Sequence, residues 1–255
     1  MSENVIKSFS HWIRKNKVHL LPTGVALVLI VIVLIIVFES ARKSAPAEYG
    51  AAPIAADGSS GVKAQSYLAS QAPVVRPNDK IFGSASAPLK VFVYEDYTNP
   101  YSAALADTLE KISVEVGNKL ALVIRPFALS NSSSAIQAAA AVDCAYAQGK
   151  WREMRALLFA RAKNQQAGSA DFASYAKQIG LNDYNFQACL TNEEKSGKIE
   201  QSIEEAKTYS VQGAPTLFIG SEMILGARPY ADFTDSNGDK IEGLKTVIQK
   251  KLSNI

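Results

Sequence analysis

The sequence predicts an α/β (α+β) domain with a helical insertion, preceded by a single N-terminal transmembrane helix. Three observations lead to this prediction. Residues 20–38 carry no charged side chain, a strand–helix–strand pattern follows from about residue 88, and an Ala-rich helical stretch separates that pattern from two further strands and a last helix. With 255 residues, the chain is long enough for one globular domain and an accessory segment.

The first feature in chain order is the apolar segment from Leu20 to Phe38, "LLPTGVALVLIVIVLIIVF". At about 1.5 Å rise per residue, a helix of this length crosses a hydrocarbon core of roughly 30 Å. Basic residues before it predict that residues 1–19 stay in the cytoplasm and that the rest is exported: Lys7, Arg14, Lys15 and Lys17. We therefore expect a single-pass protein of the cytoplasmic (inner) membrane, with its C-terminal domain in the periplasm or the extracellular space.

A cleaved signal peptide is the alternative interpretation of this segment. The apolar stretch is longer than the ~7–15 residues of a signal-peptide core. Glu39, Arg42 and Lys43 also follow it, where small residues at a cleavage site would be expected. A helix buried in a soluble core is a third alternative, and it fits poorly because the stretch is apolar on every face.

Residues 39–78 are predicted to form a flexible tether. They are rich in Ala, Ser, Gly and Pro and show neither helical nor strand periodicity. Such a segment buries too little apolar surface to offset the entropy of ordering it. A short helix is predicted only near its end, over residues 62–68.

The folded domain is predicted over residues 79–255 and begins with a βαβ unit. Residues 88–97 are a strand-like run of β-branched and aromatic side chains. Residues 102–116 form a helical pattern with apolar side chains on one face, and residues 120–127 form a second strand. The connections are short, so the two strands should be parallel with a right-handed crossover.

A helical insertion follows over about residues 130–208, with breaks at Gly149, Gly168 and Gly180. Strands are then predicted at 216–219 and 223–225, as a hairpin, and a last helix after Asp239, which with Glu242 resembles a capping box. The order β-α-β, helical block, β-β-α is that of a thioredoxin-like fold with a helical insertion.

Composition excludes several classes of site. The net charge of +3 gives no reason to expect a nucleic-acid partner, and none is predicted. Both histidines, His11 and His19, precede the domain, which excludes a His-based metal site or a Ser-His-Asp triad within it. No metal and no cofactor are predicted.

The sequence places two loops over one corner of the predicted fold. The first strand runs into Asn99-Pro100-Tyr101-Ser102, at the start of the first long helix. The second loop holds Pro215, at the position where a thioredoxin-like fold carries a cis-proline. Because only about 5–6% of X-Pro bonds in folded proteins are cis, the prediction of a cis Pro215 rests on its position in the fold.

From about residue 80 to its end, the chain resembles the DsbA family of exported thiol-disulfide oxidoreductases. The resemblance lies in "VFVYEDYTNPYS", "IRPFAL", "AAAAVDCAYAQGKWREMRALLF", "FQACL" and "VQGAPTLFIG…MILGARPY". It implies an active-site motif Cys-Pro-x-Cys at the corner, but here Asn99 and Ser102 replace both cysteines. Disulfide exchange needs an attacking thiolate and a second thiol, so the corner is predicted to be redox-inactive.

Cys144 and Cys189 are the two cysteines of the chain. An even pair in an exported domain is consistent with a disulfide. The resemblance implies that the two bridge within the helical insertion as a structural staple. A redox-active pair and two buried free thiols are the alternatives.

The resemblance implies a groove beside the proline loop that binds an extended polypeptide or protein client by β-augmentation. The predicted binding residues are Tyr97, Asn99, Tyr101, Ser102, Ala214 and Pro215, with Phe127 and Phe218 as further apolar lining. A peptide-binding or chaperone-like module, tethered through residues 20–38, is therefore the leading hypothesis. The alternatives are an oxidoreductase acting through the cysteine pair and a glutathione-binding protein, because Asn-Pro-Tyr-Ser also resembles the corner of kappa-class glutathione transferases.

Overall fold

The computed structural model describes residues 66–128, 132–164, 171–235 and 237–255. The chain divides into two compact units, residues 1–50 and 51–255, and all described residues belong to the second. The predicted cytoplasmic N-terminus, the transmembrane helix and the tether up to residue 65 lie outside the described residues. Within the described ranges, no helix combines the length and the apolar character needed to cross a membrane.

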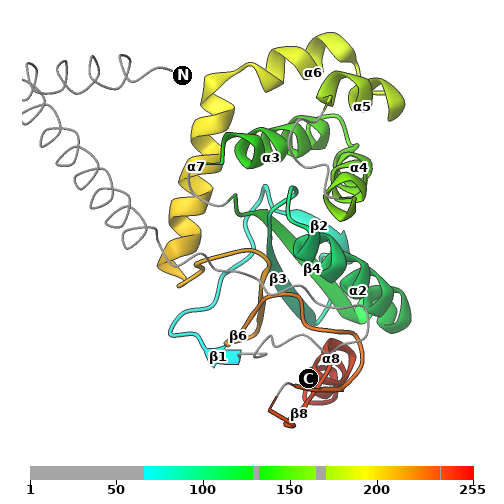
Figure 1. Cartoon of the computed structure of the whole chain (residues 1–255), viewed down its shortest axis with the longest axis vertical. Coiled ribbons are helices and arrows are strands. Elements are labelled where there is room, and N and C mark those ends of the chain that lie inside the picture. The colour runs from blue at the N-terminus through cyan, green and yellow to red at the C-terminus, as the bar shows by residue number, and fades with distance from the viewer. Residues whose placement is uncertain (1–65, 129–131, 165–170, 236) are drawn as a thin grey trace, which may run out of the picture. The chain divides into compact units, whose positions relative to one another are not determined.

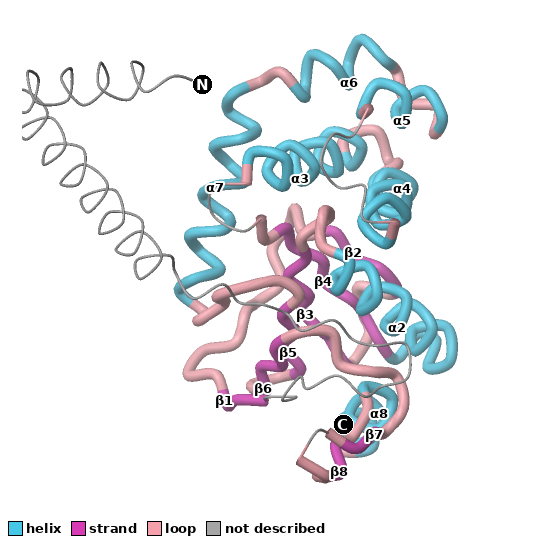
Figure 2. The backbone as a smooth tube through the Cα atoms, in the orientation of Figure 1, coloured by secondary structure: helices cyan, strands magenta, loops and turns pink. Residues whose placement is uncertain are grey.

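The centre of the domain is a mixed six-stranded sheet (Figures 1 and 2). Only the neighbours β3 and β4 are parallel, and the other pairs are antiparallel. The strand order is β1 (Ser66–Leu68), β6 (Glu222–Leu225), β5 (Thr216–Ile219), β3 (Leu89–Glu95), β4 (Leu120–Pro126) and β2 (Lys80–Gly83). A second sheet pairs β7 (Phe233–Thr234) with β8 (Lys240–Ile241).

The core lies around the central strands. Nearly every side chain of β3 and β4 is buried, as expected for parallel strands covered on both faces. The helix α2 (Pro100–Val116) connects them, followed by the short 3-10 helix η1 (Gly117–Lys119). This confirms the predicted βαβ unit. The last helix, α8 (Leu244–Ser253), packs near α2 (Figure 1).

The helical insertion between β4 and β5 is also confirmed. It gathers at one end of the sheet, and its last helix runs back toward β5 (Figure 1). Its helices are α3 (Ser133–Tyr146), α4 (Trp151–Lys163), α5 (Phe172–Gln178), α6 (Asp183–Leu190) and α7 (Glu193–Thr208).

The predicted disulfide is present in this insertion. Cys144 of α3 is bonded to Cys189 of α6, with their Cα atoms 5.8 Å apart. The bridge joins two helices that also pack against each other.

Two sequence predictions about local structure were wrong. Residues 66–68 of the predicted short helix form the edge strand β1, because they pair with β6. Asp239 does not cap the last helix, since that helix begins at Leu244 after Gly243, and Asp239 instead donates its N–H to Asp235 Oδ1.

A buried ion pair joins the end of β3 to the insertion. The Arg155 guanidinium of α4 contacts both carboxylate oxygens of Glu95, at 2.8 Å and 2.6 Å, and also Glu110 Oε1 at 2.6 Å. The side chain of Glu95 is fully buried and that of Arg155 is 6% exposed. Burial alone would lower the pKa of Arg155, but the charge and hydrogen bonds of Glu95 outweigh it and raise that pKa.

Candidate functional site

The corner at the end of β3 is built around the side chain of Asn99. Asn99 is the N-cap of α2, in extended backbone geometry with φ −97° and ψ 123°. Its Oδ1 accepts hydrogen bonds from the backbone N–H groups of Tyr101 at 2.7 Å and Ser102 at 3.3 Å. Pro100 at the first helical position lacks an N–H, so the cap satisfies free donors of the first turn. The helix therefore begins at Pro100, two residues earlier than predicted.

The same carboxamide reaches across to the proline loop. Asn99 Nδ2 donates to the carbonyl oxygen of Ala214 at 3.3 Å. The peptide bond between Ala214 and Pro215 is cis, which confirms the prediction from fold position. The Asn99 carboxamide thus accepts hydrogen bonds from the helix N-terminus through Oδ1 and donates one to the proline loop through Nδ2. It therefore links the two loops that were predicted to meet at this corner.

Ser102 lies at the corner but its hydroxyl faces inward. The residue is fully buried, and Ser102 Oγ accepts a hydrogen bond from the Asp96 N–H at 3.2 Å. Asp96 Oδ1 in turn accepts from the Thr98 N–H at 2.8 Å and from Thr98 Oγ1 at 2.6 Å. These bonds fix the turn between β3 and α2, and they leave the Ser102 hydroxyl buried rather than displayed to a ligand.

Three of the aromatic residues predicted to line a groove lie in the core instead. Tyr97 is 2% exposed, Phe127 3% and Phe218 0%. Tyr97 packs on Phe159 of α4, with ring centroids 5.6 Å apart, and burial raises the pKa of its hydroxyl well above the usual value. The prediction was wrong for these three because Phe218 lies on the buried strand β5, and Tyr97 and Phe127 lie just after β3 and β4, where their side chains pack into the core.

Of the remaining predicted residues, Pro215 is buried and the other three are partly exposed. Tyr101, Asn99 and Ala214 each keep partial exposure. No hydrogen bond joins the N–H of Ala214 to another residue that the structure describes. Within the described ranges, the Ala214 carbonyl accepts one hydrogen bond, the long one from Asn99 Nδ2. The backbone at Ala214 therefore offers one free donor, and an acceptor with a second lone pair, beside the start of α2.

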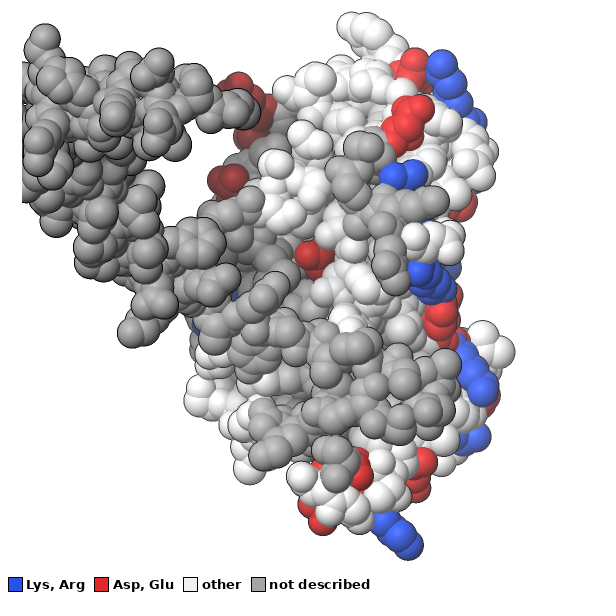
Figure 3. Space-filling model, viewed as in Figure 1, with Lys and Arg blue, Asp and Glu red and all other residues white. Residues whose placement is uncertain are grey.

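The described residues contain no cluster of three or more His, Cys, Asp or Glu side chains that fits a metal ion. On the face drawn in Figure 3, acidic and basic side chains are interspersed along one edge of the described part, without a stripe of one sign. The predicted corner residues are themselves uncharged: Asn99, Pro100, Tyr101, Ser102, Ala214 and Pro215.

Comparison with known proteins identifies the family. The thioredoxin family matches residues 76–236, which include both loops of the corner. The chain belongs to this family. Solved structures with a similar fold include a thioredoxin-like oxidoreductase from Silicibacter pomeroyi DSS-3, with a TM-score of 0.53, 19% identity and coverage of 70% of this chain and 92% of that one.

Another similar structure is Wolbachia pipientis alpha-DsbA1, with a TM-score of 0.54, 19% identity and coverage of 71% of this chain and 94% of that one. At such identities the likeness shows the fold, which is DsbA-like. Curated relatives are Na(+)/H(+) antiporter NhaA 3 of Salinispora tropica, 29% identical over 196 residues, and NhaA 1 of Mycobacterium sp. (strain KMS), 29% identical over 153 residues. These matches cover 76% and 59% of this chain but only 28% and 25% of the relatives, so the chain spans about a quarter of their length.

The position that matches the first cysteine of the DsbA motif is thus held by an asparagine that caps the helix in this thioredoxin-family protein. Sequence reasoning identified Asn99 as a missing thiol and did not predict its bond to Ala214. The available signal was the pair Asn-Pro before a helical pattern, which is typical of an N-cap followed by proline at the first helical position.

We expect Asn99→Ala to lower the free energy of unfolding by about 1 kcal/mol, because the first turn of α2 loses its cap. Asn99→Asp keeps the acceptor and adds a favourable charge at the helix N-terminus, so its loss should be smaller. Chemical denaturation of both variants measures the difference. An Asn99→Ala protein as stable as wild type would contradict the capping role.

Proposed function

We propose that this chain is a non-catalytic, DsbA-like thioredoxin-family protein that binds extended polypeptide beside its cis-proline loop. The observation that carries the proposal is the backbone of Ala214, whose N–H has no partner among the described residues and lies next to a cis X-Pro bond. An extended client supplies a carbonyl for this N–H and an N–H for the Ala214 carbonyl, as in β-augmentation.

The chemistry at the corner supports binding without exchange. A thiolate must attack a disulfide and a second thiol must resolve the mixed product. Asn99 and Ser102 provide neither group. The helix N-terminus that would lower the pKa of a cysteine is instead occupied by Asn99 Oδ1.

When no client is bound, the Asn99 side chain occupies the Ala214 carbonyl. Its bond to the Ala214 carbonyl, at 3.3 Å, is long for an N–H···O hydrogen bond, so a client N–H can compete for the same oxygen at modest cost. Tyr101, which is partly exposed on the first turn of α2, is the aromatic contact for a client side chain.

The disulfide supports a structural role for the cysteines. Cys144 is 1% exposed, and the bridge lies between α3 and α6 of the insertion rather than at the corner. A redox-active pair needs an accessible sulfur with a lowered pKa; Cys189 is partly exposed, but the bridge has no helix N-terminus of the corner beside it to lower the pKa of a thiol. We assign the pair to the stability of the insertion.

The proposal includes the location. Residues 20–38 have the length and composition of a membrane anchor, and four basic residues precede them. The thioredoxin-family domain would then be held at the outer face of the cytoplasmic membrane, where exported chains emerge unfolded. Protease protection of the domain in sealed inverted membrane vesicles tests this orientation.

We expect Ala214→Asp and Tyr101→Asp to weaken binding of an unfolded, cysteine-free client at least about tenfold, since each places a charge that must be desolvated in the groove. Tyr184→Asp is the matched control, because Tyr184 is 82% exposed on α6 of the insertion. Fluorescence anisotropy with a labelled cysteine-free client measures the affinities. Unchanged binding in both groove variants would refute the proposed surface.

A further inference from the structure

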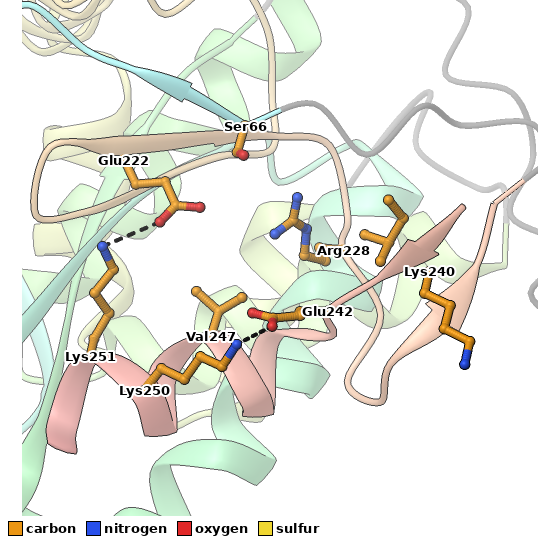
Figure 4. A pocket seen from close by; sticks show the side chains of 9 residues that line it. Ser66, Glu222, Arg228, Lys240, Glu242, Val247, Lys250 and Lys251 are labelled. Carbon is orange, nitrogen blue, oxygen red and sulfur yellow. Dashed lines mark hydrogen bonds and ion pairs between the residues drawn. The ribbon is translucent and has the colours of Figure 1, made fainter. Parts of the chain in front are cut away.

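A pocket between the strands β1, β6 and β8 and the last helix α8 suggests a second site. This pocket shares no residue with the corner. The pocket has a volume of about 300 Å³. The lining comes from β1, β6, β8 and α8, from the connection after β6 and from the residue that follows β8 (Figure 4). The lining residues are Ser66 of β1, Glu222 of β6, Arg228, Lys240 and Ile241 of β8, Glu242, and Val247, Lys250 and Lys251 of α8.

Arg228 is the unusual member of this set. It is only 7% exposed, and its guanidinium is directed into the pocket (Figure 4). Its Nε has no hydrogen-bond partner, and among the described residues no hydrogen bond or ion pair to its side chain is found. Burial lowers the pKa of Arg228, but an arginine stays protonated in proteins. Among the described residues, Arg228 is therefore a largely buried positive charge without a direct hydrogen-bond or ion-pair partner, and only the more distant charges of Glu222 and Glu242 act on it.

The acidic residues of the pocket do not supply that partner. Glu222 is bound by Lys251 at 3.3 Å, and Glu242 is bound by Lys250. Figure 4 shows both pairs at the edge of the pocket and the Lys240 side chain directed away from it. Each carboxylate is bound by one lysine and acts on Arg228 only through its charge at longer range, so no described residue binds the guanidinium directly.

A buried polar group without a partner costs free energy, and for a charged group the cost is large. An unsatisfied buried group in a native protein therefore calls for an explanation, and a bound ion is one of them. A guanidinium presents its N–H donors in a planar fork that matches two oxygens of a carboxylate or a phosphate. The space in front of Arg228 is sufficient for a group of that size.

We propose that this pocket binds an oxyanion, a carboxylate or phosphate group, through the guanidinium of Arg228. The ligand would accept hydrogen bonds from Arg228, and Ser66 would add a hydroxyl at the rim of the pocket. The two lysine–glutamate pairs flank the anion and keep the pocket from being strongly basic, so the site selects a small group and not a polyanion. This site is independent of polypeptide binding at Ala214.

The test is the stability of the full-length protein in inorganic phosphate, in acetate and in chloride, at equal ionic strength. We expect a saturable rise in the unfolding midpoint with phosphate, acetate or both, and none with chloride. Phosphate alone or acetate alone would assign the ligand class, and a response to both would assign a general oxyanion site. Calorimetric titration with the effective anion gives the dissociation constant.

Three variants make the test specific. Arg228→Met should lose the response, with a dissociation constant at least about tenfold weaker, and should be more stable than wild type without anion because the unpaired charge is gone. Arg228→Lys keeps the charge but lacks the fork, and should bind with intermediate affinity. Lys177→Gln, an exposed charge on α5, should respond like wild type.

Two outcomes would overturn the proposal. One is the absence of any anion-specific stabilisation of the wild-type protein. The other is an equal response in wild type, Arg228→Met and Lys177→Gln, which would show a general salt effect and no site at Arg228.

Discussion

Arg155→Met is expected to lower the free energy of unfolding by about 3–5 kcal/mol, because it leaves the Glu95 carboxylate buried without a counter-charge. Arg155 provides two hydrogen bonds to Glu95 and one to Glu110. Glu95 is completely buried at the end of β3, so water cannot replace the lost donors.

The double variant Glu95→Gln with Arg155→Met should recover much of this loss, since no buried charge then remains. Lys163→Met is a matched control on the same helix, because it breaks an ion pair with Asp107 in which both side chains are exposed, at 42% and 64%. We expect Lys163→Met to lower the free energy of unfolding by less than about 1 kcal/mol. Urea denaturation measures all three, and a loss below about 1 kcal/mol for Arg155→Met would contradict the buried pair.

Loss of the disulfide should lower the free energy of unfolding by about 4 kcal/mol. Cys144 and Cys189 are 45 residues apart in sequence, and a closed loop of that length lies between the cases of about 3 and 4.7 kcal/mol in the chain-entropy account. Both cysteines are in the insertion, so α3 and α6 should be the helices that loosen first.

The measurement is urea denaturation of the wild-type protein with and without reductant, beside the double variant Cys144→Ala with Cys189→Ala. The reduced protein and the double variant should have similar midpoints, and reductant should leave the double variant unchanged. A reduced protein as stable as the oxidised one would contradict the structural role of the bridge.

The sequence predicted the order of the central elements because its signals there are local. β3 and β4 are rich in β-branched and aromatic residues, α2 has an apolar face, and short connections enforce the parallel pairing. The cis Pro215 was predicted from its position in the fold and the structural pairing of the cysteines from the family resemblance, since neither follows from local propensity.

Features that depend on long-range packing were not predicted. Residues 66–68 are a strand only because β6 offers them an unpaired edge. Arg155 and Glu95 are 60 residues apart, and no sequence pattern pairs them. Phe218 was expected to face a client, but its side chain is fully buried in the core and packs edge-on against Tyr94 of β3.

At the corner, too, some features could be predicted from the sequence and others needed the fold. The absence of thiols at Asn99 and Ser102 is visible in the sequence. The bond from Asn99 to the Ala214 carbonyl joins residues that are 115 positions apart and needed the fold to place them. Arg228 lies in "MILGARPY", one of the stretches that resemble the DsbA family. Only its burial and its unbonded Nε distinguish it from an ordinary surface arginine.

The central claim is that a client strand pairs with the backbone at Ala214. Amide hydrogen exchange at Ala214, measured residue by residue by NMR with and without a cysteine-free unfolded client, tests it most directly. Because the N–H of Ala214 has no partner in the described structure, we predict exchange at least about tenfold slower when the client is bound. Unchanged exchange at Ala214 under conditions where the client is shown to bind would contradict the account and place the binding surface elsewhere.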